Sequence, residues 1–284
     1  MTNLNITPRC LLGPGPSNVH PRILQALSYP LIGHLDPRFI KLMGEIQEML
    51  RYTFQTDNKL TIPISGTGSA GMEAALCNFI EPGTSVLVCV NGYFSERMVE
   101  MSLRYGADLT RIDKEWGEVF SFEEIEEALN KKPAKIVAIV HAETSTGILQ
   151  SLDGLSKIVH DHGGLLLVDA VTSLSGIPLK VDDWDIDIVY SGTQKCIGAP
   201  PGLSPITISP RAVKELNSRK SKVANWYLDL TMVGKYWGSE RTYHHTAPIS
   251  MNYALYEALK IITEEGLEER WIRHKKNAEI LWNG

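Results

Sequence analysis

Residues 60–71 read LTIPISGTGSAG, and this stretch decides the fold class. Its first five residues are mostly β-branched or apolar and predict a short buried strand. Residues 65–71 are all small or glycine, and a helical pattern with Met72, Leu76 and Phe79 on one face follows them. A strand, a glycine-rich loop and a helix in direct succession are typical of one unit of an α/β fold.

The same alternation continues along the chain. The candidate strands are Leu60-Ile64, Val86-Val90, Asp108-Ile112, Ile136-Val140, Leu165-Val168, Ile186-Tyr190 and Ile206-Ile208. Helical patterns lie between them, and Ser121 with Glu124 forms a capping box that predicts the start of one helix. Strands that alternate with amphipathic helices predict an α/β fold with a mainly parallel sheet flanked by helices.

The two ends of the chain have different patterns. The prolines of Gly13-Pro-Gly-Pro16 forbid regular structure, so we expect residues 1–20 to form an extended N-terminal arm. Near the other end, an apolar helical stripe is closed by Gly266 in a C-cap position. We expect one large domain over residues 21–265, and we expect residues 266–284 to begin a truncated C-terminal domain.

Composition excludes several classes of protein. The chain has 284 residues and a net charge of -5, with no basic patch of the kind that nucleic-acid binding needs. Its longest apolar stretches are strand-sized and its N-terminus has no signal-peptide pattern, so we expect no membrane contact and a cytoplasmic location. The four cysteines show no C-x-x-C spacing, and the adjacent His244 and His245 should point in different directions without a third ligand. No metal site is therefore expected.

Ligands of open α/β sheets gather at the carboxyl ends of the strands, and the first such end resembles a phosphate cradle. Residues 65–71 offer small side chains and free amides at a helix N-terminus, with no acidic residue before Glu73. The loop also matches the G-x-G-x-x-G pattern of dinucleotide sites, but Val86-Val90 ends in Asn91 where the ribose needs an acid. A nicotinamide dehydrogenase is a distant alternative, and a turn that serves packing alone is another.

Two further strand ends carry an acid and an amine. Asp169 follows four apolar residues of a strand that we expect to be buried, where a carboxylate needs a cationic partner such as a pyridinium N–H. Lys195 ends Ser191-Gly-Thr-Gln-Lys195, and the apolar residues after it favour an amine whose pKa is low enough to form a Schiff base. The ordinary alternatives are a capping aspartate and a surface lysine. Cradle, carboxylate and lysine together predict a pyridoxal phosphate site.

Two other strand ends are open to more than one interpretation. Ser145 lies in the turn His141-Ala-Glu-Thr-Ser-Thr-Gly147, where it either contacts cofactor or substrate or serves only the turn. Phe94 follows Val86-Val90 closely, where its ring either stacks on a pyridine or belongs to the core.

Several motifs occur in an order that identifies a family. They are Leu11-Leu-Gly-Pro-Gly-Pro-Ser-Asn18, Ser65-Gly-Thr-Gly, Glu73-Ala-Ala-Leu76, Glu143-Thr-Ser-Thr-Gly147, Leu165-Leu-Leu-Val-Asp169, Ser191-Gly-Thr-Gln-Lys195, Ala199-Pro-Pro-Gly202 and Tyr243-His-His-Thr246. This set resembles class V aminotransferases of the alanine–glyoxylate and serine–pyruvate type. The resemblance implies a type I pyridoxal-phosphate fold and an enzyme that moves an amino group from alanine or serine to glyoxylate or another small 2-oxo acid. Cysteine desulfurases, phosphoserine aminotransferases and a catalytically impaired cofactor-binding fragment are the alternatives.

The resemblance also implies a role for each matching residue. Lys195 carries the cofactor as a Schiff base, Asp169 pairs with the pyridine nitrogen and Phe94 stacks on the ring, while Ser145 lines the substrate side. The residues implied to hold the phosphate end are Thr67, Gly68, Ser69 and Gln194. The residues implied to reach in from a neighbouring subunit are Gly33 and His34 at the substrate and Tyr243 and Thr246 at the phosphate. A homodimer with shared active sites follows from the resemblance.

The chain departs from the family pattern in two respects. Many relatives carry tryptophan where Phe94 stands and histidine where Ser69 stands, but phenylalanine still stacks and serine still donates. Relatives also continue into a small C-terminal domain with the arginine that binds the substrate carboxylate. We therefore expect this chain alone to bind pyridoxal phosphate but to transaminate poorly, and we expect the apolar stripe through Leu259 and Ile262 to be exposed.

Overall fold

A seven-stranded sheet forms the centre of the computed structural model, which describes residues 6, 7 and 9–284. The strand order is β1-β9-β8-β7-β4-β2-β3. The strands are β1 (Leu60–Ser65), β2 (Ser85–Val90), β3 (Asp108–Asp113), β4 (Ile136–Val140), β7 (Leu165–Asp169), β8 (Ile188–Tyr190) and β9 (Leu203–Ile208). Strand β9 is antiparallel to both of its neighbours and every other pair in the sheet is parallel, which confirms the prediction of a mainly parallel sheet.

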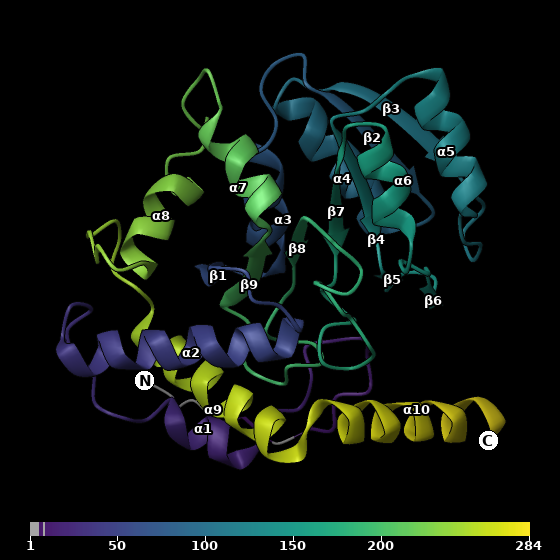
Figure 1. Cartoon of the computed structure of the whole chain (residues 1–284). Helices are drawn as coiled ribbons and strands as arrows, with labels where there is room; N and C mark the ends of the chain where they lie inside the picture. The colour runs from purple at the N-terminus through teal and green to yellow at the C-terminus, as the bar shows by residue number, and fades with distance from the viewer. Residues whose placement is uncertain (1–5, 8) are drawn as a thin grey trace.

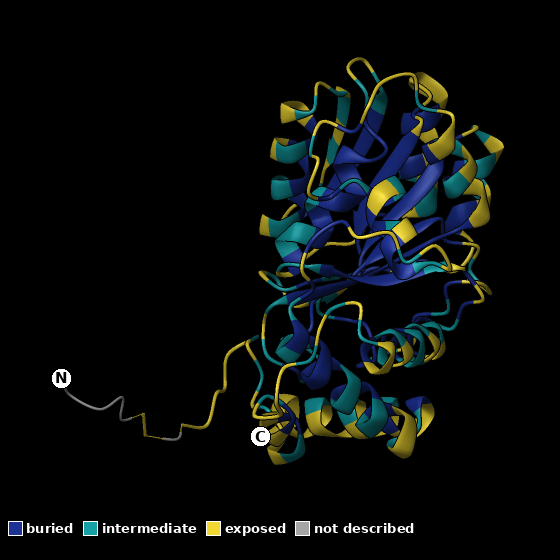
Figure 2. Cartoon of the chain, turned by 90° about the vertical axis from the view of Figure 1, so that its left-hand side faces the viewer, coloured by how far each residue is buried: buried dark blue, intermediate teal, exposed yellow. Residues whose placement is uncertain are grey.

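Helices cover both faces of this sheet (Figure 1). They are α1 (Pro21–Ala26), α2 (Pro37–Phe54), α3 (Gly68–Cys77), α4 (Tyr93–Arg104), α5 (Phe122–Lys131), α6 (Leu155–Asp161), α7 (Pro210–Asn217), α8 (Leu230–Trp237), α9 (Ile249–Glu265) and α10 (Leu267–Asn283). Figure 2 shows the buried strands between these helices. All five residues of β4 and of β7 are buried, as expected for parallel strands with both faces covered. No helix in the described part of the chain is both long and apolar enough to cross a membrane.

Two local predictions are confirmed by hydrogen bonds. Ser121 Oγ accepts from the amide of Glu124, and the Glu124 carboxylate accepts from the amide of Ser121 at 2.8 Å, which is the predicted capping box of α5. Gly266 ends α9 with a positive φ of 82° and donates its amide to the carbonyl of Ile262. Glycine reaches this left-handed conformation without the steric cost that other residues meet.

One strand is shorter than the sequence predicts. We expect Ile186-Tyr190 to be a strand, but β8 begins only at Ile188. The reason is Asp187, whose buried carboxylate accepts from the amide of Leu166 at 2.9 Å. A side-chain oxygen therefore takes the place of a ladder hydrogen bond at this end of β8. The two-residue strands β5 (Ala142–Glu143) and β6 (Ile148–Leu149), which pair with each other, were not predicted.

The N-terminal arm packs beside the lysine turn. Its described residues up to 20 contain neither helix nor strand, as predicted, while Met1 to Asn5 and Pro8 lie outside the described residues. The amide of Ser17 donates to the carbonyl of Gln194 at 2.8 Å, and Ser17 Oγ donates to the carbonyl of Lys195 at 3.1 Å. The N-terminal arm is thus hydrogen-bonded to the turn that follows the carboxyl end of β8.

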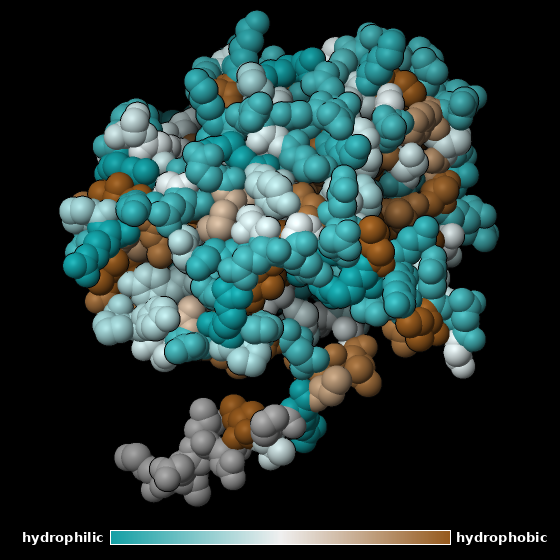
Figure 3. All heavy atoms as spheres, turned by 60° about the horizontal axis from the view of Figure 1, so that its bottom comes forward, coloured by the Kyte–Doolittle hydropathy of each residue, from teal (hydrophilic) through white to brown (hydrophobic). Residues whose placement is uncertain are grey.

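The apolar stripe of α9 is buried, so the prediction that it is exposed is wrong. Leu255, Leu259 and Ile262 have no exposed surface because α9 packs against α1 and α2. These helices and α10 lie together below the sheet in Figure 1. Figure 3 shows this face of the molecule, where hydrophobic residues are exposed in separate patches among hydrophilic ones. On α10 the exposed apolar residues are Ile272, Ile280, Leu281 and Trp282.

Helix α3 approaches the sheet very closely at Gly71. A methyl group on Gly71 would overlap Ser204 Oγ and would lie 3.3 Å from Tyr190 Cβ. Ser204 cannot easily turn away, because its hydroxyl donates to the buried carbonyl of Ser191. By contrast, a methyl group on Gly44, in the middle of α2, would meet no atom within 4 Å.

We expect two glycine-to-alanine substitutions in helices to have opposite effects. Gly71→Ala should lower the free energy of unfolding by about 1–3 kcal/mol, because the added methyl group overpacks the contact with Ser204. Gly44→Ala should raise it by about 0.5–1 kcal/mol, because alanine favours the helix and nothing opposes its side chain. Urea denaturation of the two variants and the parent measures both changes. A stabilising effect of Gly71→Ala would contradict the close approach of α3.

Candidate active site

A cavity of about 250 Å³ lies where the carboxyl ends of β7 and β8 meet the loops that follow β1 and β2. Its lining residues are Thr67, Gly68, Ser69, Met72, Phe94, Arg97, Asp169, Val171, Gln194 and Lys195. Seven of them are residues that the sequence predicts for the site, and they come from four separate strand ends. The structure therefore brings together the predicted cradle, carboxylate and lysine.

The cradle is formed by the N-terminus of α3. Thr67 is the N-cap residue but makes no side-chain capping bond, and the first turn contains no acidic residue. The first amides of a helix have no partner within it, so they can donate to an anion. Gly68 packs closely on the strand end after β7, since a methyl group there would lie 3.2 Å from Val171. A small residue is thus required where the first turn of α3 meets the segment after β7.

Gln194 adds a polar group without a partner. Its Oε1 is buried and makes no hydrogen bond among the described residues. An unpaired polar atom that is buried costs stability unless a ligand satisfies it. Rotation of the amide by half a turn would place the NH₂ donor in the same position. Gln194 and the first amides of α3 therefore fit the phosphate end of the predicted cofactor.

Lys195 is half-buried and is covered by the N-terminal arm. Its Nζ donates to the carbonyl of Pro14 at 2.8 Å, and a methyl group on Gly15 would lie 2.7 Å from the same nitrogen. Burial lowers the pKa of the lysine amine. A half-buried amine that lies under the arm and lines the cavity disfavours the surface-lysine interpretation.

Asp169 is a buried carboxylate that retains free acceptor sites. The hydroxyl of Tyr190 donates to Oδ2 at 2.7 Å and the amide of Val171 donates to Oδ1 at 2.8 Å. Burial raises the pKa of Asp169 to about 6, although both hydrogen bonds oppose this change. Each carboxylate oxygen can accept a second hydrogen bond. The site therefore favours a cationic donor such as a protonated ring nitrogen.

The start of α4 is fixed by Glu143, a contact that sequence reasoning missed. The Glu143 carboxylate is buried and accepts from the amides of Phe94 and Ser95 at 3.2 and 3.3 Å. Negative charge at a helix N-terminus is stabilising. Gly92 is needed here because any side chain on it would overlap Glu143. The result is a fixed position for the Phe94 ring on the cavity wall.

Ser145 supports the same helix start. Its hydroxyl donates to Glu143 at 2.7 Å and accepts from the amide of Tyr93 at 3.0 Å. It does not belong to the lining of the cavity. The structure thus gives Ser145 a role in the turn, and its contact with cofactor or substrate stays a prediction.

Arg97 is a second residue that sequence reasoning missed. Its guanidinium lies 5.2 Å from the ring centre of Tyr93 and 5.1 Å from that of Phe94, and Nη1 donates to Ser69 Oγ at 3.0 Å. It therefore connects the ring on α4 to the phosphate loop. The signal in the sequence is its spacing, because a residue three positions after Phe94 lies on the same helix face.

Four predicted residues lie together but outside the cavity. The ring of Tyr243 is 4.9 Å from that of His34, and the Tyr243 and Thr246 hydroxyls are 3.4 Å apart. Gly33, Tyr243 and Thr246 are exposed. None of the four lines the cavity that holds Lys195.

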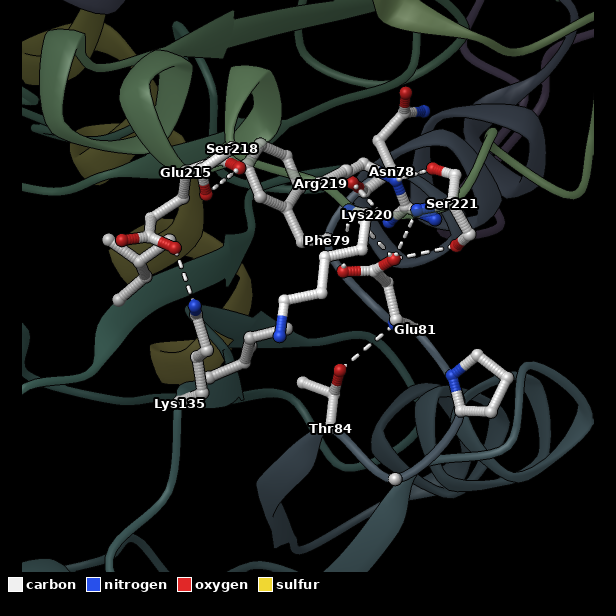
Figure 4. Close-up of a pocket in the computed structure, with 14 residues that line it drawn as sticks. Asn78, Phe79, Glu81, Thr84, Lys135, Glu215, Ser218, Arg219, Lys220 and Ser221 are labelled. Carbon is white, nitrogen blue, oxygen red and sulfur yellow. Dashed lines mark hydrogen bonds and ion pairs between the residues drawn. The ribbon is translucent and has the colours of Figure 1, made fainter.

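A larger cavity of about 550 Å³ lies at the opposite end of the sheet, beside the amino ends of β2, β4 and β7. Figure 4 shows hydrogen bonds and an ion pair among the residues that line it. Lys135 pairs with Glu215 at 2.5 Å, and Glu81 accepts from the hydroxyl of Ser221 at 2.6 Å. Both its position and its internal pairing disfavour it as an active site.

Comparison with known proteins shows the family to which the chain belongs. The chain matches the family model "Aminotransferase class-V" over residues 22–283. It is 44% identical to alanine–glyoxylate aminotransferase of Rattus norvegicus over 276 residues, which cover 96% of this chain and 67% of that protein. It is 39% identical to (S)-ureidoglycine–glyoxylate transaminase of Bacillus subtilis over 294 residues, with coverage of 97% and 71%.

A solved structure shows the same fold. The crystal structure of alanine–glyoxylate aminotransferase from Nostoc sp. superposes with a TM-score of 0.99 at 55% identity, and the match covers 100% of this chain and 75% of that one. The predicted type I pyridoxal-phosphate fold is confirmed by this similarity. The chain spans about two thirds to three quarters of the length of these relatives. It belongs to the class V aminotransferases, which are pyridoxal-phosphate-dependent transaminases.

Proposed function

We propose that this protein transfers an amino group from alanine or serine to glyoxylate or another small 2-oxo acid. The observation that carries the proposal is the position of an enclosed lysine amine and a buried carboxylate in one cavity, beside an uncapped helix N-terminus. The relatives from rat and Nostoc are named for alanine and glyoxylate, and the one from Bacillus for ureidoglycine and glyoxylate. Because glyoxylate is common to all three names, the acceptor has more support than the donor.

The cavity offers a partner for each end of the cofactor. The residues that would hold its phosphate are Thr67, Gly68, Ser69 and Gln194. Phe94 would lie against the ring, and Arg97 fixes that side chain relative to Ser69. When bound, pyridoxal phosphate supplies an aldehyde carbon that receives the amino group and a ring that withdraws electrons.

Lys195 is the base of the proposed reaction. Because burial lowers its pKa, a larger fraction of the amine is neutral at a given pH than for a surface lysine. A neutral Lys195 amine would bind the cofactor aldehyde, and once the amino group of the substrate has displaced it, it could take a proton from the substrate Cα and return it. The carbonyl of Pro14 accepts a hydrogen bond from Nζ and so orients this amine inside the cavity.

Asp169 would hold the ring nitrogen in its protonated form. A buried carboxylate is costly without a cationic partner, and the two donors that it has are both neutral. A protonated ring nitrogen would supply the missing charge and would occupy one of the free acceptor sites. The carboxylate would in turn keep the proton on that nitrogen and so maintain the electron-withdrawing character of the ring.

The proposal includes a homodimer with shared active sites. Gly33, His34, Tyr243 and Thr246 lie next to one another and outside the cavity that they are predicted to serve. The exposure of Gly33, Tyr243 and Thr246 supports a role at the site of a second copy. Tyr243 and Thr246 would then add two hydroxyl donors to the phosphate end of the neighbouring cavity.

The lysine assignment is tested by chemical labelling. Borohydride reduction of the protein with bound pyridoxal phosphate should fix a pyridoxyl group on Lys195, because this is the enclosed amine of the cavity. Peptide mapping by mass spectrometry locates the label, and Lys195→Ala should remove it. The same preparation is assayed with alanine and with serine, each with glyoxylate. Label on a different lysine would refute the assignment, and label on Lys195 without turnover would refute the proposed reaction alone.

We expect Asp169→Asn to stabilise the cofactor-free protein while weakening cofactor binding. The pKa of this carboxyl is raised, so the folded state binds the proton more tightly than the unfolded state, and stability is lost as pH rises from about 4 to about 6. Above that range the buried charge costs at most about 3 kcal/mol, which the neutral amide avoids.

Thermal unfolding at pH 4 and pH 8 measures this effect. The variant should melt higher than the parent at pH 8 and at nearly the same temperature at pH 4, while titration with pyridoxal phosphate should show weaker binding. The exposed Asp153 supplies the matched control, and Asp153→Asn should change neither quantity. If Asp169→Asn melts below the parent at pH 8, groups of the protein already compensate the charge of the Asp169 carboxylate.

A further inference from the structure

The adjacent residues His244 and His245 are buried, and their rings meet. The two Nδ1 atoms are 2.8 Å apart, so the expectation that these side chains point in different directions is wrong. That expectation applies to a regular strand, whereas residues 241–245 belong to no helix or strand. The two rings are thus held in a defined arrangement, and neither ring has a role in the proposed transamination.

Hydrogen bonds extend from this pair in both directions. His245 Nε2 is 2.7 Å from Ser65 Oγ, and His244 Nε2 is 3.2 Å from the carbonyl oxygen of Trp226. All four ring nitrogens are therefore engaged. Ser65 ends β1 and directly precedes the phosphate loop that begins at Gly66.

The direction of each of these hydrogen bonds follows from the one at the carbonyl of Trp226. A carbonyl oxygen only accepts, so His244 Nε2 must carry a proton. Neither ring has a carboxylate partner in the described part of the chain that would favour a second proton, so each ring carries one proton and Nδ1 of His244 is an acceptor. His245 must then donate from its own Nδ1, which leaves its Nε2 as an acceptor. The hydroxyl of Ser65 therefore donates to His245.

The surroundings of the rings hold this arrangement in place. The indole of Trp226 stacks on His244 at 4.3 Å, and the ring of Tyr227 lies 4.9 Å from His245. Burial lowers the pKa of His245 to about 4, with the neighbouring His244 as a smaller cause, so this imidazole stays neutral at neutral pH. A neutral, packed ring keeps one tautomer.

The same cluster reaches the residues predicted to serve the neighbouring subunit. The ring of Tyr236 lies 6.2 Å from that of His245, and its hydroxyl donates to the carbonyl of His34 at 3.0 Å. The ring of His34 contacts Tyr243, which directly precedes the histidine pair. One network of contacts thus joins Ser65, at the phosphate loop, to His34 and Tyr243.

We propose that Ser65, His245 and His244 form a one-way hydrogen-bond chain that positions the segment Tyr243–Thr246 relative to the phosphate loop of the same protomer. The consequence is a coupling between the two cofactor sites of the dimer, because this segment serves the partner's phosphate while Ser65 adjoins its own. The coupling rests on the proposed homodimer and on the proposed cofactor site. The three residues are positioning residues and take no part in proton transfer to substrate.

The direction of the chain is tested without cofactor or activity. Nitrogen-15 NMR of the histidine-labelled protein at neutral pH should show His245 with its proton on Nδ1 and His244 with its proton on Nε2. In Ser65→Ala the acceptor at His245 Nε2 loses its donor, so the His245 resonances should change, while Ser65→Thr, which keeps the hydroxyl, should restore them. The remote His162 serves as the internal control. A proton on Nε2 of His245 in the parent protein would overturn the proposal.

The coupling is tested with hybrid dimers. One protomer carries Lys195→Ala, so that pyridoxyl label reports only the intact site of the other. Ser65→Ala placed in the Lys195→Ala protomer should weaken cofactor binding at the intact site roughly tenfold, the effect of losing one positioning hydrogen bond. Ser65→Thr in the same place should restore the affinity.

Two results would overturn the coupling. One is unchanged affinity at the intact site, and the other is sedimentation of the parent protein as a monomer. Neither result affects the labelling of Lys195, so failure of this inference is distinguishable from failure of the proposed reaction. If Ser65→Ala does not fold, the tautomers of the parent protein still decide the direction of the chain.

Discussion

The carboxylate of Asp169 ends a strand whose other four residues are apolar and buried, and much of the site is arranged around it. A buried charge costs folding free energy unless polar groups are bonded to it, so the elements that supply these groups pack closely around Asp169. Tyr190 supplies a hydroxyl from β8, and Gly71 lets α3 approach Tyr190 without a clash. Gly68, at the start of the same helix, packs on Val171, whose amide also serves Asp169. The phosphate loop is therefore positioned by the same close packing that surrounds the carboxylate.

The sequence predicted the strand ends well because strand patterns depend on nearby residues. Thr67, Asp169 and Lys195 each lie within five residues of the end of a predicted strand, and parallel strands bring such ends to one edge. The contacts of Glu143 with the start of α4 and of Arg97 with Ser69 could not be predicted in this way. Glu143 accepts a hydrogen bond from the amide of Ser95, which is 48 residues away in the sequence. This hydrogen bond depends on how α4 crosses the sheet. Long-range contacts of this kind follow from packing geometry that local patterns do not contain.

Hydrophobic periodicity identified the buried face of α9 but not what covers it. The stripe through Leu259 was predicted to lack a partner, whereas α1 and α2 bury it completely. Periodicity shows that a helix has an apolar face, but any element with a matching apolar face can pack against it. The histidine pair shows the same limit for polar residues, since its hydrogen-bond partners, Ser65 and Trp226, are far away in the sequence.

The bond between Lys195 and Pro14 joins residues that are 181 positions apart. Closing a loop of this length costs chain entropy, and contacts of such long range form slowly. During folding, the arm can dock only after β8 and the turn that follows it have placed the lysine. Until the arm docks, it does not cover the lysine, so a small molecule can reach the amine from that side before the start of the chain closes over it.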